Sequence, residues 1–173
     1  WLRDKWFNFE FVDAVARQRT LDFLGVNYYS RQLVHVKKPG IRNLLTDVCA
    51  HGHHPVKKNF LGWDIYPRGL YDLLLELKTY QVPIVVTENG ICTPDDQLRW
   101  EYVSEHLKSV HAAIQQGVDV RGYLYWSLMD NFEWAQGYGP RFGVIDINYT
   151  TFERTVRESA RRFAQICKTG TLS

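Results

Sequence analysis

Pro83-Ile84-Val85-Val86-Thr87-Glu88-Asn89-Gly90 is the stretch that decides the fold class. Its apolar residues follow one another without polar alternation, which is typical of a strand buried on both faces of a parallel sheet. Glu88 follows directly, so a carboxylate lies where a buried strand meets its loop. Catalytic residues of βα barrels gather at this end of the sheet. On spacing alone, Glu88 could equally cap the next segment or pair with a base.

The segments around this strand repeat the same organisation. Further short apolar strands are predicted for residues 22–28, 122–126 and 142–147. Three helical patterns each place apolar side chains on one face: Leu70, Leu73, Leu74 and Leu77; Val103, Leu107, Val110 and Ile114; and Val156, Ala160, Phe163 and Cys167. Pro67 precedes the first helix, and Gly117 and Gly170 follow the other two, as expected for helix ends. The order of strands and helices predicts an α/β fold with right-handed βα units.

Length and composition favour a single unit over residues 1–173. The chain has 173 residues, 45% of them hydrophobic, whereas a whole βα barrel needs roughly 250 residues. A formal charge of +2, spread along the chain, argues against nucleic-acid and membrane partners. The chain has three cysteines, an odd number, and they are widely spaced at positions Cys49, Cys92 and Cys167. This pattern favours a reducing, cytoplasmic setting. The chain begins with Trp1 rather than Met, so we expect it to be truncated.

Residues 36–61 form the segment with the least periodicity. The segment is rich in glycine, proline, lysine and histidine, and we predict a long surface loop of the kind that often borders a binding cleft. It also contains Cys49, His51, His53 and His54, which could be read as a metal site. Their spacing matches no standard zinc pattern, so a solvated polar loop is the favoured interpretation. We therefore predict no metal and no cofactor.

The motif at residues 87–90 (TENG) resembles the nucleophile signature of family-1 glycoside hydrolases. Residues 22–30 (DFLGVNYYS) are similar to that family's sixth barrel strand, and residues 62–67 (GWDIYP) to its approach to the seventh. Residues 126–134 (WSLMDNFEW) are similar to its eighth strand and the following loop. The motifs occur in the family's order. The resemblance implies a partial (β/α) TIM barrel made of the last three strands, sixth to eighth, with their helices.

The resemblance also implies a retaining β-glycosidase, similar to β-glucosidases, that hydrolyses O-glycosyl bonds of small-molecule glycosides. Glu88 would be the nucleophile that forms a covalent glycosyl intermediate. Tyr29 would orient it by donating a hydrogen bond, which favours the ionised carboxylate.

The same resemblance assigns the substrate-binding residues. Glu133 and Trp134 would bind sugar hydroxyls, Trp126 would form the floor beneath the ring, Phe142 would complete the wall, and Asn27 would line the same pocket. Without the resemblance, the tryptophans would be read as core residues, because large aromatic side chains near strands usually are.

One part of the family pattern is missing from the sequence. Retaining hydrolysis needs a second carboxyl group about 5 Å from the nucleophile. The family takes this acid/base from an Asn-Glu-Pro motif, and the chain contains no Asn-Glu dipeptide; Glu10, the nearest imitation, is assigned a structural role. Two interpretations follow. The chain acts as an enzyme only when a missing N-terminal barrel part complements it, or it self-associates, for example as a homodimer, and binds sugars without efficient turnover.

Overall fold

The computed structural model describes residues 8–36, 46–48 and 56–172. A parallel sheet of three strands forms its centre, in the order β1 (Leu24–Asn27), β4 (Ile84–Asn89) and β5 (Val120–Tyr125). The other elements are α2 (Glu10–Arg17), β2 (Val34–Val36), β3 (Thr46–Val48), α3 (Pro67–Leu77), η3 (Lys78–Tyr80), α4 (Asp96–Gln115), η4 (Trp134–Gln136), β6 (Ile145–Ile147), β7 (Arg154–Val156) and α5 (Glu158–Thr169). The predicted α/β class and the first three predicted strands are confirmed.

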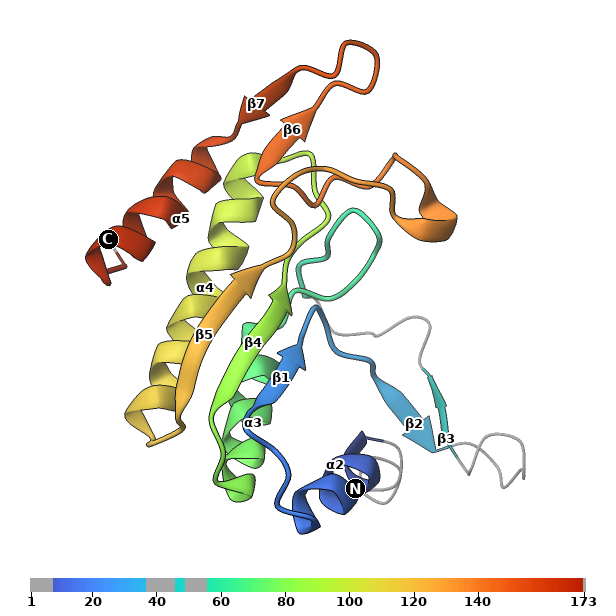
Figure 1. The fold of residues 1–173 in the computed structure, drawn as a ribbon. Helices are drawn as coiled ribbons and strands as arrows, with labels where there is room; N and C mark the ends of the chain where they lie inside the picture. The colour runs from blue at the N-terminus through green and yellow to red at the C-terminus, as the bar shows by residue number, and fades with distance from the viewer. Residues whose placement is uncertain (1–7, 37–45, 49–55, 173) are drawn as a thin grey trace.

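Helices α3 and α4 cover one face of the sheet (Figure 1). Pro67 starts α3 in the position where a missing N–H costs nothing, and Leu70, Leu74 and Leu77 of that helix are buried. These leucines pack with Ile84 and Val86 of β4 and with residues of β1 and α4 in one hydrophobic cluster. The amphipathic pattern of α3 therefore predicted its buried face correctly.

The opposite face of the sheet is uncovered by the described elements (Figure 1). Along β1, Leu24 and Val26 are buried while Gly25 and Asn27 are exposed, and Leu124 of β5 is 57% exposed. One face of the sheet is therefore open, as we expect for three parallel strands without the rest of a barrel. The apolar runs nevertheless match a sheet whose second face is meant to be covered.

The fourth predicted strand, residues 142–147, does not join the parallel sheet. Its last part forms β6, which pairs antiparallel with β7, while Phe142 to Val144 form a buried connection. Asn148 closes this hairpin, because its carbonyl accepts from the N–H of Phe152 at 2.7 Å and its side chain accepts from Thr150 at 2.9 Å. An apolar run of this length cannot distinguish a central strand from a hairpin strand.

Helix α5 begins later than predicted. Val156 belongs to β7 and is 43% exposed, so it does not share the apolar face of the helix. Asp96 of α4 sets the start, since it accepts from the N–H of Ser159 at 2.9 Å. Gly170 ends α5 in the left-handed conformation, with φ +67°, as its predicted place at the helix end requires.

The segment predicted as a long surface loop, residues 36–61, contains a short strand. This strand, β3, pairs antiparallel with β2. The candidate metal ligands Cys49, His51, His53 and His54 lie outside the described residues. Within the described ranges, no group of three or more His, Cys, Asp or Glu could hold a metal ion, and no helix has the length and apolar character needed to cross a bilayer.

Candidate active site

The predicted site residues come from the ends of the three parallel strands. Asn27 ends β1, Glu88 is the next-to-last residue of β4, and Trp126 directly follows β5. Asn27 and Glu88 are partners in the β1–β4 register. Because parallel strands point the same way, all three residues lie at the carboxyl edge of the sheet, where ligands of α/β folds bind.

Glu88 and Tyr29 form a direct contact. The Tyr29 hydroxyl donates a hydrogen bond of 2.7 Å to Oε2 of Glu88. Burial and this carboxylate raise the pKa of Tyr29 well above its ordinary value, so the hydroxyl keeps its proton and remains a donor. The predicted hydrogen bond is thus present, and the catalytic roles of the two residues stay predictions.

Asn89, which the sequence reasoning did not single out as a site residue, holds the strand ends together. Its fully buried side chain donates to the carbonyl of Tyr28 at 2.6 Å and to the hydroxyl of Tyr102 at 2.9 Å, and accepts from Tyr123 at 2.6 Å. The hydroxyl of Tyr102 in turn donates to the carbonyl of Tyr29 at 3.1 Å. A fully satisfied buried network of this kind orients the backbone on both sides of Glu88.

Asn27 is oriented from the neighbouring strand. The hydroxyl of Thr87 donates to Oδ1 of Asn27 at 2.6 Å, which fixes which end of the amide faces β4. Both side chains lie on the open face of the sheet, as does Gly25, where an added Cβ would meet the Thr87 side chain at 3.3 Å. Asn27 is thus placed beside Glu88, and its role in lining a sugar pocket stays a prediction.

Gly90 and Trp126 make the closest backbone approach in the site. A Cβ on Gly90 would lie 2.8 Å from the carbonyl carbon of Trp126 and nearer still to its oxygen. The N–H of Trp126 also donates to the carbonyl of Asn89 at 3.0 Å. Only glycine leaves room for this approach, which explains in steric terms why glycine ends the motif at residues 87–90.

Three aromatic rings from distant parts of the chain form a wall beside Glu88. The ring centroids of Tyr29, Trp63 and Phe142 lie 6.1 to 6.2 Å from one another. Phe142 is 3% exposed and Trp63 is 38% exposed, so Trp63 presents the accessible surface. The sequence reasoning included Phe142 and omitted Trp63. The signal that could have found Trp63 is its place within the motif at residues 62–67.

The loop after β5 is held by a buried carboxylate. Asp130 accepts from the N–H of Gly143 at 2.8 Å, from Arg141 at 3.1 Å and from Arg157 at 3.2 Å. The peptide bond between Trp126 and Ser127, where this loop begins, is cis. The loop leaves the sheet and extends beyond the ends of the strands (Figure 1).

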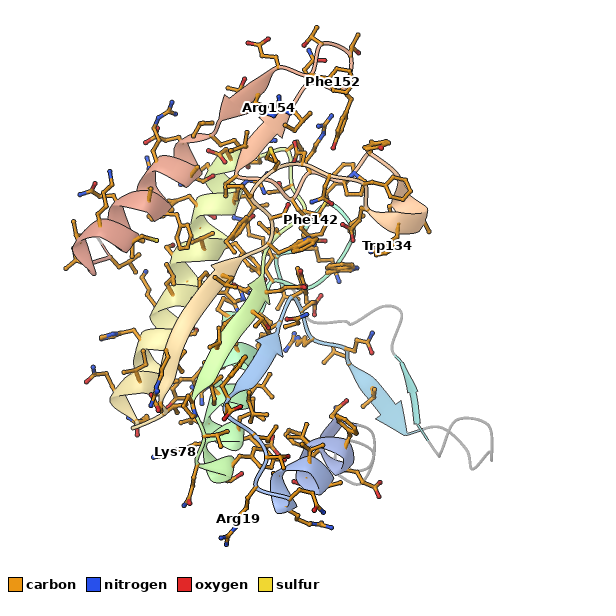
Figure 2. The ribbon with its side chains drawn as sticks, in the orientation of Figure 1. Arg19, Lys78, Trp134, Phe142, Phe152 and Arg154 are labelled. Atoms are coloured by element: carbon orange, nitrogen blue, oxygen red, sulfur yellow. The ribbon has the colours of Figure 1, made fainter. Side chains whose placement is uncertain are left out.

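Glu133 and Trp134, at the tip of this loop, have different surroundings. Burial and the charge of Glu88 raise the pKa of Glu133 above its ordinary value, so the two carboxylates influence each other across the site. Trp134 is 81% exposed and extends outward, whereas Phe142 lies near the strand ends (Figure 2). The structure thus brings Glu133 toward Glu88 and leaves Trp134 at the rim.

Comparison with known proteins places this arrangement in a family. The family model described as glycosyl hydrolase family 1 matches residues 3–171. The chain is similar to a β-galactosidase from Pyrococcus woesei, with 38% identity over 87% of the chain and 32% of the relative. It is also similar to β-glucosidase A from Thermotoga maritima, with 36% identity over 90% of the chain and 36% of the relative.

A solved structure agrees with these relatives. The β-glycosidase from Pyrococcus horikoshii superimposes with a TM-score of 0.91 at 39% identity, covering 98% of this chain and 43% of that protein. The chain spans about a third of the length of the two curated relatives. The match over nearly all of the chain shows that the protein belongs to glycosyl hydrolase family 1.

Proposed function

We propose that this chain carries the nucleophile half of a retaining β-glycosidase site on the last three strands of a partial TIM barrel. The hydrogen bond from Tyr29 to Glu88, at the carboxyl edge of a parallel sheet and beside an aromatic wall, is the observation that carries the proposal. Family membership supports the reaction class. The proposed substrates are small-molecule glycosides, which fit an open carboxyl edge lined by rings and carboxylates.

The proposed chemistry begins at Glu88. Its carboxylate attacks the anomeric carbon, the bond to the aglycone breaks, and a covalent glycosyl ester forms. Tyr29 keeps the carboxylate in place by donating to Oε2. Glu133 accepts hydrogen bonds from sugar hydroxyls, Trp126 provides the floor, and Trp134 at the rim also binds sugar hydroxyls. Water then releases the sugar and restores Glu88.

A second carboxyl group is needed to protonate the leaving group. The sequence lacks the Asn-Glu motif that provides it in the family, so we propose that turnover by the chain alone is weak and is restored when the missing N-terminal barrel part is added. Substrates with poor leaving groups lose most from this deficit, because they depend most on protonation. Activated glycosides should therefore react far faster than natural ones.

The open face of the sheet supports complementation. Leu124 of β5 is exposed on this face. A mainly apolar hollow of about 580 Å³ lies between β5, the edge strand, and α5, on the side of β5 opposite to Leu124, and Leu128 contributes to it. Its lining includes Tyr125, Val144, Ile145, Ala160, Phe163 and Cys167. Open strand edges and apolar patches favour association. The alternative is a homodimer that covers this face and binds sugars without efficient turnover.

Trapping with a 2-deoxy-2-fluoroglucosyl fluoride tests the proposal, because fluoride leaves with little acid assistance. Intact mass and peptide mapping should find one adduct, on Glu88, and none in the Glu88→Gln control. A folded protein that gives no adduct would refute a working nucleophile site. The galactosyl analogue, run in parallel, distinguishes the two sugar types named among the relatives.

Sedimentation analysis separates the two interpretations of the open face. A compact dimer that dissociates in Leu124→Lys would support self-association, whereas a monomer at all concentrations would exclude it and leave complementation. Leu124 suits this test because its side chain is exposed on the face without a covering layer.

A further inference from the structure

Arg99 is a fully buried cation that the proposed chemistry does not use. It lies in the first turn of α4, whose N-terminal end is at the carboxyl edge of the sheet, and its exposed fraction is 0%. Removing a guanidinium from water is costly unless its N–H groups are satisfied. The contacts that satisfy Arg99 therefore indicate what this residue holds together.

The guanidinium of Arg99 bonds to the backbone of two separate segments. Nη1 donates to the carbonyl oxygen of Ile91 at 3.1 Å, and Nη2 donates to that of Thr93, both in the segment after β4. Nη1 also donates to the carbonyl oxygens of Phe142 at 3.2 Å and Arg141 at 3.3 Å, in the segment before β6. One planar group thus joins the segment that follows Glu88 to the segment that carries Phe142, one of the three rings of the aromatic wall.

Four further hydrogen bonds reinforce this junction between the segment after β4 and the segment before β6. The hydroxyl of Tyr125, at the end of β5, accepts from Arg99 at 3.1 Å and donates to the carbonyl of Phe142 at 3.0 Å. The N–H of Thr93 donates to the carbonyl of Arg141 at 3.0 Å. Asp96, on the same turn of α4, accepts from Nε of Arg99 at 3.3 Å.

The junction determines where the wall stands relative to the nucleophile. The Phe142 ring contacts the Tyr29 ring edge-on at 6.2 Å, and the hydroxyl of Tyr29 donates to Glu88. Phe142 is buried behind Trp63, the accessible ring of the wall, at a centroid distance of 6.2 Å. A shift of the Phe142 backbone therefore moves the support of Trp63, while Tyr29 remains anchored through its bonds to Glu88 and Tyr102.

We propose that Arg99 is a positioning residue of the glycosidase site, which sets the aromatic wall at Phe142 against the nucleophile segment. The proposal rests on the proposed function of Glu88. Lysine could not replace Arg99, because an ammonium group has three donors around one point, whereas the planar guanidinium reaches several carbonyls in fixed directions. The role is to hold the backbone, since Arg99 makes no contact with the carboxylate of Glu88 in the described structure.

Amide hydrogen exchange tests the junction without any substrate. In Arg99→Lys, exchange at the N–H groups of Thr93 and Val144 should rise about tenfold or more, because their protection depends on the joined segments. Val110→Ala is the matched control: it removes core packing from the same helix and should raise exchange evenly. Wild-type protection in Arg99→Lys, or the same local rise in Val110→Ala, would overturn the proposal.

Trapping kinetics provide the functional measurement. With the fluoroglucosyl fluoride, Arg99→Lys should raise the concentration for half-maximal trapping about tenfold and leave the maximal rate within about twofold, since the wall moves and the Tyr29–Glu88 bond remains. An equal fall in the maximal trapping rate in Arg99→Lys and in the control Val110→Ala would mean a general loss of folding and would overturn the positioning role.

A second variant covers the case in which Arg99→Lys does not fold. Tyr125→Phe removes only the hydroxyl that links Arg99 to Phe142, and it should raise exchange at Val144 about threefold to fivefold. No change at Val144 in that variant would count against the junction. If the wild type forms no adduct, the proposed function fails, while the exchange result still decides whether Arg99 joins the two segments.

Discussion

Substitution of Gly90 by alanine tests most directly how the site is built. The new methyl group would lie 2.8 Å from the carbonyl carbon of Trp126. The atoms that it meets belong to the backbone of Trp126, so no flexible side chain can move aside. An ordinary carbon contact is about 3.4 Å or more, and the carbonyl oxygen of Trp126 is nearer still than its carbon, so the Trp126 peptide or β4 must move by about 1 Å or more.

This displacement should lower both the stability of the protein and the rate of trapping at Glu88. Overpacking of a tight interior costs about 1–3 kcal/mol, so we expect the free energy of unfolding to fall by that amount in urea titration. A misplacement approaching 1 Å beside reacting groups can reduce the rate by about two orders of magnitude, so trapping at Glu88 should slow by about tenfold to a hundredfold. Both effects arise because the proposed floor residue Trp126 and the strand that carries the proposed nucleophile make their closest backbone approach at this point.

Gly139→Ala is the matched control for Gly90→Ala. The nearest neighbour of a Cβ at Gly139 is the carbonyl oxygen of Gln136 at 3.8 Å, which is an ordinary contact. This variant should keep wild-type stability within about 0.5 kcal/mol. If Gly90→Ala also kept wild-type stability and trapping rate, the close approach of the two strand ends would not constrain the site, and the steric argument would be refuted.

The remaining predictions concern stability. Asp130→Asn should lower the free energy of unfolding by about 3–5 kcal/mol, because it leaves two arginines beside a group without charge. Asp119→Asn, at a solvent-exposed pair, should change the stability far less, and equal urea midpoints for the two variants would contradict this. Burial lowers the pKa of His106 from 6.5 to about 4, so the unfolded chain binds more protons between these values, and stability should fall by up to about 3 kcal/mol as the pH drops from 6.5 to 4. His106→Phe should remove that part of the pH dependence, and an unchanged slope would refute it. Leu74→Ala, at a fully buried position of α3, should cost about 2–5 kcal/mol by thermal or urea unfolding; a smaller loss would mean that the core collapses around the cavity.

Local pattern was sufficient for the elements that carry the site. The apolar run before Glu88 and the proline at position 67 act through neighbouring residues only, so the strand and the helix start could be predicted from the sequence. The resemblance of the motifs then led to the contact between Tyr29 and Glu88, which are 59 residues apart. The catalytic role of that pair stays a prediction.

The sequence predictions that failed depended on contacts between distant segments. Residues 142–147 look as apolar as a central strand, and only the pairing of β6 with β7 shows that this segment closes a hairpin. Trp126 and Trp134 belong to one motif, yet one lies beside Gly90 and the other is exposed on the rim. No local property of a tryptophan distinguishes these two environments.

The sequence by itself determined the class of the fold, the buried face of α3 and the position of Glu88 at a strand end, because each depends on periodicity within one segment. For α4 the predicted face was only partly right, because Val103 and Val110 are buried whereas Ile114 is 41% exposed. The tertiary structure alone decided that Trp63 joins the wall and that Arg99 is buried. An arginine in the first turn of a helix ordinarily faces solvent. Here it is buried because carbonyls from two loops, 8 and 43 residues away along the chain, converge on it.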